Sequence, residues 1–189
     1  AGSAVGSFVL WLAISVPMHL KIASTVGILV VLSIRRSIVE IQETVAQDSK
    51  VFAFPSSRLL LLAFIAFSIM LGEGAIADWS ALYMEEVIES PTFMIGLAFS
   101  SFALFMALGR FSGDAIIPLF GMKRVVFFGS ILSAVALSIA LVAKDPWLAL
   151  VGFGLTGFGF SCIIPVIFSS AAHEPGYSAG AGIASVTVI

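Results

Sequence analysis

The stretch GFGLTGFGF, residues 152–160, has a glycine spacing that could bind a nucleotide. Its first six residues match G-x-G-x-x-G, which holds a dinucleotide pyrophosphate where a strand ends and a helix begins. No strand pattern precedes the stretch, and it lies inside the apolar run 147–172 with no basic residue nearby. A phosphate there would be unpaired in hydrocarbon, so we expect no nucleotide and no other cofactor.

The same glycines predict close helix packing, because small residues let two helix backbones approach each other. Helical spacing puts Gly152 and Gly159 on one side, with Gly154 and Gly157 displaced from them. We therefore expect contacts to more than one neighbouring helix.

A carboxyl group is the second candidate for chemistry. Glu73 lies between Gly72 and Gly74 in a run that is uncharged from Leu59 onward. A carboxyl inside the hydrocarbon is costly unless it faces a cavity or a partner, and such groups often mark a solute or ion pathway. Burial favours the neutral, protonated form. Glu73 is therefore predicted to carry a proton or to bind a solute.

Three further side chains of the segment GEGAIADWSALYMEE join this candidate pathway: Asp78, Trp79 and Tyr83. Trp79 and Tyr83 are four residues apart, so they share a helix face that could stack on a sugar or another ring. The alternative places both rings in the aromatic belt at the membrane surface and Asp78 at the outer interface.

Other chemistries find little support in the residue types. The single cysteine, Cys162, excludes a disulfide framework or a CxxC metal site, and His19 and His173 have no second ligand nearby. Nine Lys and Arg residues that form no basic face argue against nucleic acid. No Ser/His/Asp set is discernible, so we expect a protein that is not an enzyme.

The composition indicates a membrane protein. Hydrophobic residues make up 60% of the 189 and charged residues 11%, and the mean hydropathy is +1.15. A soluble domain has roughly 45–50% apolar and 25% charged residues. The fold class expected is an all-α, polytopic membrane helix bundle in contact with lipid.

Apolar runs of suitable length place the helices. Within the last long run, Pro165 frees a backbone carbonyl and favours a kink. We expect a further helix to start near Gly180. The helices predicted before it cover about 1–16, 19–37, 57–85, 92–113, 123–143 and 146–171.

Positive charges predict the orientation, because Lys and Arg are enriched in short cytoplasmic loops. Seven of the nine flank two loops, at about 37–57 and 114–122, which two intervening helices put on one side. That side is therefore expected to be cytoplasmic. The seven residues are Arg35, Arg36, Lys50, Arg58, Arg110, Lys123 and Arg124.

The second of these loops carries a recognisable signature. The segment GRFSGDAIIPLFGMKRV, residues 109–125, resembles the loop signature of the major facilitator superfamily, in which G-x-x-x-D is followed by a turn glycine and paired basic residues. The resemblance implies a conformational latch in which Asp114 faces a neighbouring helix end. The alternative is a set of charges that only set orientation. The matching residues are Gly109, Arg110, Gly113, Asp114, Gly121, Lys123 and Arg124.

The segment 72–86 is similar to the seventh helix of the bacterial fucose-permease-like branch of that superfamily, where E-G-A-x-A-D-W-S-x-x-Y is familiar. The resemblance implies that the chain covers helices five to ten and the start of helix eleven. Residues 1–37 would then end the N-terminal bundle, 38–56 form the cytoplasmic central loop, and 57–189 form a truncated C-terminal bundle.

The function implied is secondary active transport of a small solute by alternating access, with proton coupling as in symport. The solute would be a sugar or a related metabolite, and efflux is an equal alternative. A bacterial cytoplasmic (inner) membrane is the expected location. The competing interpretation is a non-transporting membrane scaffold or an inactive fragment, because alternating access uses both halves of such a protein.

Overall fold

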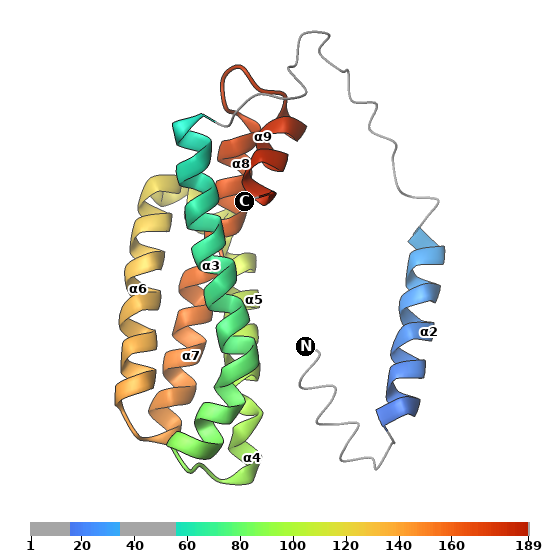
Figure 1. Cartoon of the computed structure of the whole chain (residues 1–189), viewed down its shortest axis with the longest axis vertical. Helices are drawn as coiled ribbons and strands as arrows, with labels where there is room; N and C mark the ends of the chain where they lie inside the picture. The colour runs from blue at the N-terminus through green and yellow to red at the C-terminus, as the bar shows by residue number, and fades with distance from the viewer. Residues whose placement is uncertain (1–15, 35–55, 189) are drawn as a thin grey trace. The chain divides into compact units, whose positions relative to one another are not determined.

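The computed structural model describes residues 16–34 and 56–188 (Figure 1). The chain divides into two units, residues 1–47 and 48–189, which are described separately. In the first unit, α2 covers Val16–Ile34. It begins earlier than expected because Pro17 lies in its first turn, where a missing N–H is tolerated. The expected helix 1–16 and central loop 38–56 lie almost wholly outside the described residues.

The second unit is a helix bundle, and its described part contains no strand. Four of its segments are long and apolar enough to cross a membrane: Ser57–Val87, Thr92–Phe120, Met122–Val142 and Pro146–Ala172. The all-α, multi-pass membrane fold predicted from the composition is confirmed. The elements are α3 (Ser57–Leu82), a π-helical turn (Tyr83–Val87), α4 (Thr92–Ile95), α5 (Leu97–Phe120), α6 (Met122–Val142), α7 (Pro146–Phe160), α8 (Ile163–Ala172) and α9 (Ala179–Thr187).

Local residues set where these helices begin. The Ser56 hydroxyl caps α3 by accepting a hydrogen bond from the Leu59 N–H at 3.2 Å. Asp145 caps α7 in the same way, accepting from the Leu148 N–H at 2.8 Å. Gly121 alone separates α5 from α6, with a φ of 81°. That left-handed conformation favours glycine.

The end of α5 differs from the expectation. The predicted helix 92–113 and loop 114–122 are wrong, because α5 continues to Phe120 and includes Pro118. A proline in the last turn removes the bond that its own N–H would make to the carbonyl of Asp114, four residues earlier. The turn is still closed by the Gly121 N–H, which donates to the Ile117 carbonyl at 2.8 Å.

The last spanning segment is broken between α7 and α8. The helical pattern stops at Ser161 and Cys162, where one continuous helix with a kink was expected. Pro165 has no N–H to donate to the Ser161 carbonyl, so the break lies one turn before the proline. The Ser161 N–H bonds instead to the Phe158 carbonyl at 3.3 Å.

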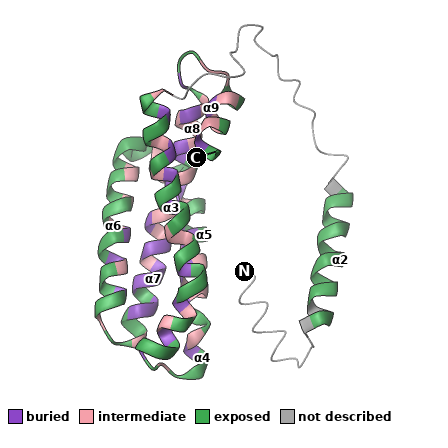
Figure 2. Cartoon of the chain, viewed as in Figure 1, coloured by how far each residue is buried: buried purple, intermediate pink, exposed green. Residues whose placement is uncertain are grey.

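The most buried helix is α7, which packs between α5 and α6 (Figures 1 and 2). In an apolar 18-residue stretch of the segment Pro146–Ala172, 67% of the residues are buried, whereas in the corresponding stretch of α6 17% are buried. A Cβ at Gly152 would lie 2.7 Å from the Ala136 carbonyl oxygen of α6, whereas one at Gly154 would lie 2.7 Å from the Ser101 hydroxyl of α5. The glycines of α7 therefore contact two different helices.

The remaining two glycines of this string follow the same division. Gly159 faces Ser133 and Gly129 of α6, and Gly157 faces the Phe102 carbonyl of α5. The Ser133 hydroxyl lies within 3.1 Å of the Thr156 carbonyl, so a hydrogen bond also joins α6 to α7.

Candidate functional site

Two ionisable side chains of opposite sign line one cavity between α3 and α5. The cavity has a volume of about 740 Å³. Glu73 comes from α3 and Arg110 from α5, and the other lining side chains are apolar or aromatic. The full lining consists of Met70, Glu73, Gly74, Ala77, Phe99, Phe102, Ala103, Met106, Ala107, Arg110 and Phe111.

Both charges lie well inside their spanning segments. At 1.5 Å per residue, Glu73 is about 24 Å along the helix from Ser57, and Arg110 is about 15 Å from Phe120. Arg110 was expected near the end of the helix 92–113, beside the cytoplasmic loop. Because α5 continues to Phe120, Arg110 instead lies ten residues before the helix end, beside the cavity, so it is available for a role in a solute pathway.

The two groups act on each other through space. Glu73 is half-buried, and the Arg110 guanidinium is the charged group that acts on its carboxyl electrostatically. Among the described residues, Arg58 and Glu174 form an ion pair, whereas Glu73 and Arg110 do not. Glu73 and Arg110 therefore both face the cavity without a direct contact between them. A carboxyl in such a position can exchange a proton, and an unpaired guanidinium can bind an anionic or polar group.

The other three predicted pathway residues are not among those lining this cavity. The Tyr83 hydroxyl donates to the Leu141 carbonyl at 2.8 Å, and its ring packs edge-to-face on Phe153 with centroids 6.3 Å apart. Tyr83 therefore connects the end of the first span to α6 and α7. Asp78 and Trp79 are exposed, with Trp79 at 64%. The pathway role of these three residues stays a prediction.

Apart from Arg110, which lines the cavity, and Gly121, which forms the turn, the signature residues of the α5–α6 region separate into two groups. Gly109 and Gly113 face the α7–α8 break, where a Cβ at Gly113 would lie 3.0 Å from the Cys162 sulfur. Their small size serves helix packing, which the resemblance alone did not indicate. The members of the second group are exposed and form no ion pair in the described part of the chain: Asp114, Lys123 and Arg124.

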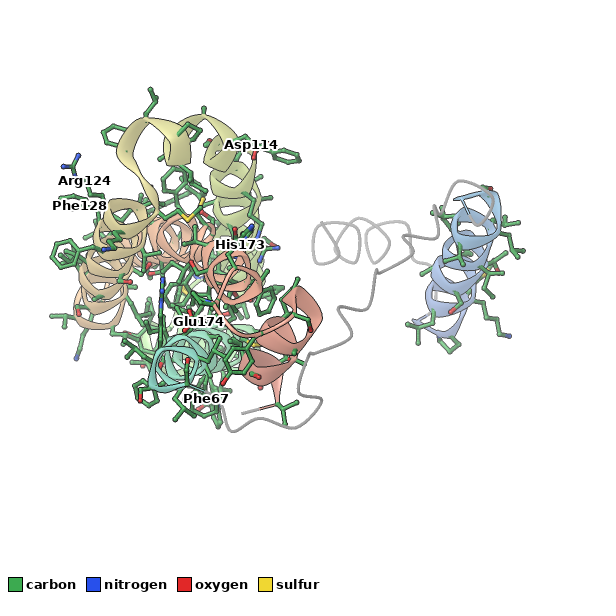
Figure 3. All side chains as sticks on the ribbon, turned by 90° about the horizontal axis from the view of Figure 1, so that it is seen from above. Phe67, Asp114, Arg124, Phe128, His173 and Glu174 are labelled. Atoms are coloured by element: carbon green, nitrogen blue, oxygen red, sulfur yellow. The ribbon has the colours of Figure 1, made fainter. Side chains whose placement is uncertain are left out.

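The sequence reasoning missed a buried carboxylate. Glu174, in the turn after α8, is only 9% exposed and lies beside the start of α3 (Figure 3). It accepts a hydrogen bond from the Ser56 hydroxyl at 3.1 Å and pairs with Arg58 at 3.4 Å. The contact joins residues far apart in the sequence, and a single acid before a proline in a polar turn gives no signal of it.

Comparisons with known proteins give three relatives, all bacterial. The chain is 33% identical over 142 residues, 75% of its length, to an uncharacterised MFS-type transporter of Yersinia pestis, of which this covers 37%. It is 34% identical over 132 residues, 69% of the chain and 32% of the relative, to membrane protein MosC of Rhizobium meliloti. It is 30% identical over 134 residues, 71% of the chain and 36% of the relative, to an uncharacterised transporter of Sinorhizobium fredii.

The chain thus spans about a third of the length of the curated relatives that it matches. No protein-family model matches it. No solved structure matches it either.

Proposed function

We infer that this chain is part of a major facilitator superfamily protein, and we propose that the protein is a secondary active transporter of a small solute. Relatives named as transporters, one of them as MFS-type, support this, as do the four helices able to cross a membrane. The fucose-permease-like branch and the numbering of the helices stay predictions. The bacterial relatives favour a bacterial cytoplasmic membrane.

The observation that carries the proposal is the cavity between α3 and α5. Two opposite charges inside the span, one carboxyl and one guanidinium, line a space of about 740 Å³. Ionisable groups at this depth are costly in lipid and are characteristic of substrate and proton pathways. The cavity is therefore proposed as part of the pathway along which the solute passes during alternating access.

The chemistry of the lining suggests how the solute is held. Phe99, Phe102 and Phe111 offer aromatic surface for the apolar face of a solute, and Arg110 offers donors for a polar or anionic group. The absence of a side chain at Gly74 keeps one wall open. Glu73 is proposed to carry the coupling proton, because a carboxyl can be neutral in the closed site and charged when water reaches it.

The test is Glu73→Gln in the full-length transporter, reconstituted in vesicles. Glutamine imitates the protonated carboxyl, so accumulation driven by a pH gradient should disappear while exchange of solute at equal concentrations continues. The matched control is Glu86→Gln, an exposed carboxyl in the π-helical turn, which should leave both assays unchanged.

Other outcomes are equally informative. A parallel loss of exchange and accumulation in Glu73→Gln would assign Glu73 to solute binding. Normal values in both assays would remove the cavity from the pathway. No uptake by the wild-type protein of any sugar or metabolite tested would favour a non-transporting scaffold.

A further inference from the structure

A second cavity lies between α5, α6 and the α7–α8 break. Its volume is about 260 Å³, and it occupies the end of the bundle at which α5 turns into α6. Nothing in the proposed transport pathway uses it, because none of its lining residues lines the Glu73 cavity. Its lining consists of Gly109, Ile116, Phe120, Arg124, Val125, Phe128, Gly129, Leu132, Phe158, Gly159, Ser161 and Cys162.

The interior of this cavity offers hydrocarbon contacts and no free hydrogen-bonding side chain. The Ser161 hydroxyl already donates to the Phe158 carbonyl at 2.6 Å, and the Cys162 thiol donates to the Gly109 carbonyl at 3.4 Å. The remaining interior side chains are aliphatic or aromatic. The part of a ligand that enters must therefore be apolar, because a polar group there would lose its partners.

The rim of the cavity is positively charged. Arg124 lies in the first turn of α6, next to Lys123, and both side chains are exposed. Neither has an ion-pair partner among the residues that the structure describes. Figure 3 shows Asp114 on α5, away from Arg124 on α6. The N-terminal end of α6 adds its own partial positive charge.

The entrance faces the surroundings of the bundle. Phe128, one turn below Arg124, is 63% exposed and lies on the same side of α6 in Figure 3. Since α6 is an apolar helix long enough to span a membrane and is mostly exposed, we take the bilayer as its surroundings at this level. Arg124 lies at the end of that span, where lipid head groups lie, and the apolar cavity extends below it.

We propose that this cavity binds one acyl chain of an anionic phospholipid, with Arg124, which lines the cavity, holding its phosphate and the neighbouring Lys123 adding positive charge at the same helix end. An apolar recess below a cationic rim matches an amphiphile with a negative head group. Basic recesses between membrane helices bind anionic lipids in this way. The proposal rests on membrane residence and on the cavity, and not on the transport function.

Native mass spectrometry of the full-length protein in detergent tests the site. Phosphatidylglycerol and phosphatidylcholine with identical acyl chains are added in turn, and the bound lipid is counted. We expect one molecule of phosphatidylglycerol to bind more tightly than phosphatidylcholine by about fivefold for each basic residue involved. Arg124→Gln should reduce this preference by about fivefold, and Arg124→Lys should retain most of it.

Matched controls locate the bound lipid. Lys144→Gln removes an exposed positive charge at the opposite end of α6 and should leave binding unchanged. Val125→Phe fills the cavity and should weaken phosphatidylglycerol binding, whereas Ile131→Phe, on an exposed part of α6 outside the cavity, should not. Cys162, the single cysteine, should be alkylated by N-ethylmaleimide more slowly when phosphatidylglycerol is present.

Several results would overturn the proposal. Equal binding of the two phospholipids, or full retention of the preference in Arg124→Gln, would remove the role of the charged rim. Unchanged binding in Val125→Phe together with unchanged alkylation of Cys162 would place the lipid elsewhere. Preferential binding of a free fatty acid over phosphatidylglycerol would assign the cavity to a different amphiphile.

Discussion

The two sides of α5 are built differently. Toward α7, glycines and serines bring the backbones together, and the Ser101 hydroxyl donates across the interface to the Leu150 carbonyl at 2.8 Å. Toward α3, the same helix borders an open cavity with a charge on each wall. Phe102 takes part in both sides, since its carbonyl faces Gly157 and its side chain lines the cavity.

This difference shows how one membrane helix can pack tightly on one side and border a solute cavity on the other. In lipid there is little hydrophobic gain from bringing helices together, so close packing of small residues holds them. The α5–α7 side has that packing and leaves no room for a solute. The α3–α5 side lacks it, so charges and a solute can be accommodated without breaking helix contacts.

The largest expected effect comes from adding a side chain on the closely packed side of α5, which faces α7. In Gly157→Leu the new side chain would overlap the Phe102 carbonyl, so α5 and α7 must move apart. Overpacking of this kind costs about 3 kcal/mol. Thermal unfolding of the purified protein should show a large loss of stability, or no folded protein should be recovered.

The matched control is Gly74→Leu, in α3, on the open side of α5 that borders the Glu73 cavity. A Cβ at Gly74 would meet nothing within 4 Å. This variant should fold and lose transport, because leucine occupies part of the cavity. Equal stability losses in the two variants would show that the two sides of α5 do not differ as described.

The next effect concerns the open side alone. Arg110→Gln should reduce solute transport about tenfold, because a charge-assisted hydrogen bond to the solute is lost. Its thermal stability should stay close to wild type, since Arg110 is exposed and forms no ion pair among the described residues. Lys144→Gln serves as the control for loss of a positive charge. Unfolding of Arg110→Gln would mean that the guanidinium supports the bundle instead.

A smaller effect is expected at Tyr83, which packs against α6 and α7 and does not line the cavity on the open side. Its hydroxyl donates to the Leu141 carbonyl at 2.8 Å, so Tyr83→Phe should cost about 1 kcal/mol of stability and leave transport unchanged. Thermal unfolding and uptake measured on the same preparation check both parts. Reduced uptake with unchanged stability would return Tyr83 to the solute pathway predicted from the sequence.

The sequence allowed the membrane class and the spanning segments to be predicted because both depend on composition and run length. It also allowed the two-sided packing of α7 to be predicted, since glycine spacing defines helix faces. The end of α5 was missed because Asp114 and Pro118 look like loop residues, although both are tolerated near a helix end. The Glu73–Arg110 cavity required the tertiary fold, since two residues on different helices carry no shared pattern.

The smallest effect is expected at the end of α5. Asp114 is exposed and unpaired in the described residues, and charges at helix ends contribute about 0.3–1 kcal/mol. If Asp114 acts as a latch, Asp114→Asn should change the transport rate by about twofold to fivefold while the amount of protein in the membrane stays the same. An unchanged rate would leave Asp114 with a role in orientation only.

The two glycine faces of α7 also have a consequence for the order in which the helices assemble during synthesis. Its partners α5 and α6 both precede it in the chain, so a ribosome completes them first. When α7 leaves the translocation channel, both of its docking surfaces are already in the bilayer. Until α7 is inserted, α5 and α6 lack the helix that separates them, and the backbones at Gly129 and Gly109, which face Gly159 and Phe158 in the finished bundle, stay uncovered.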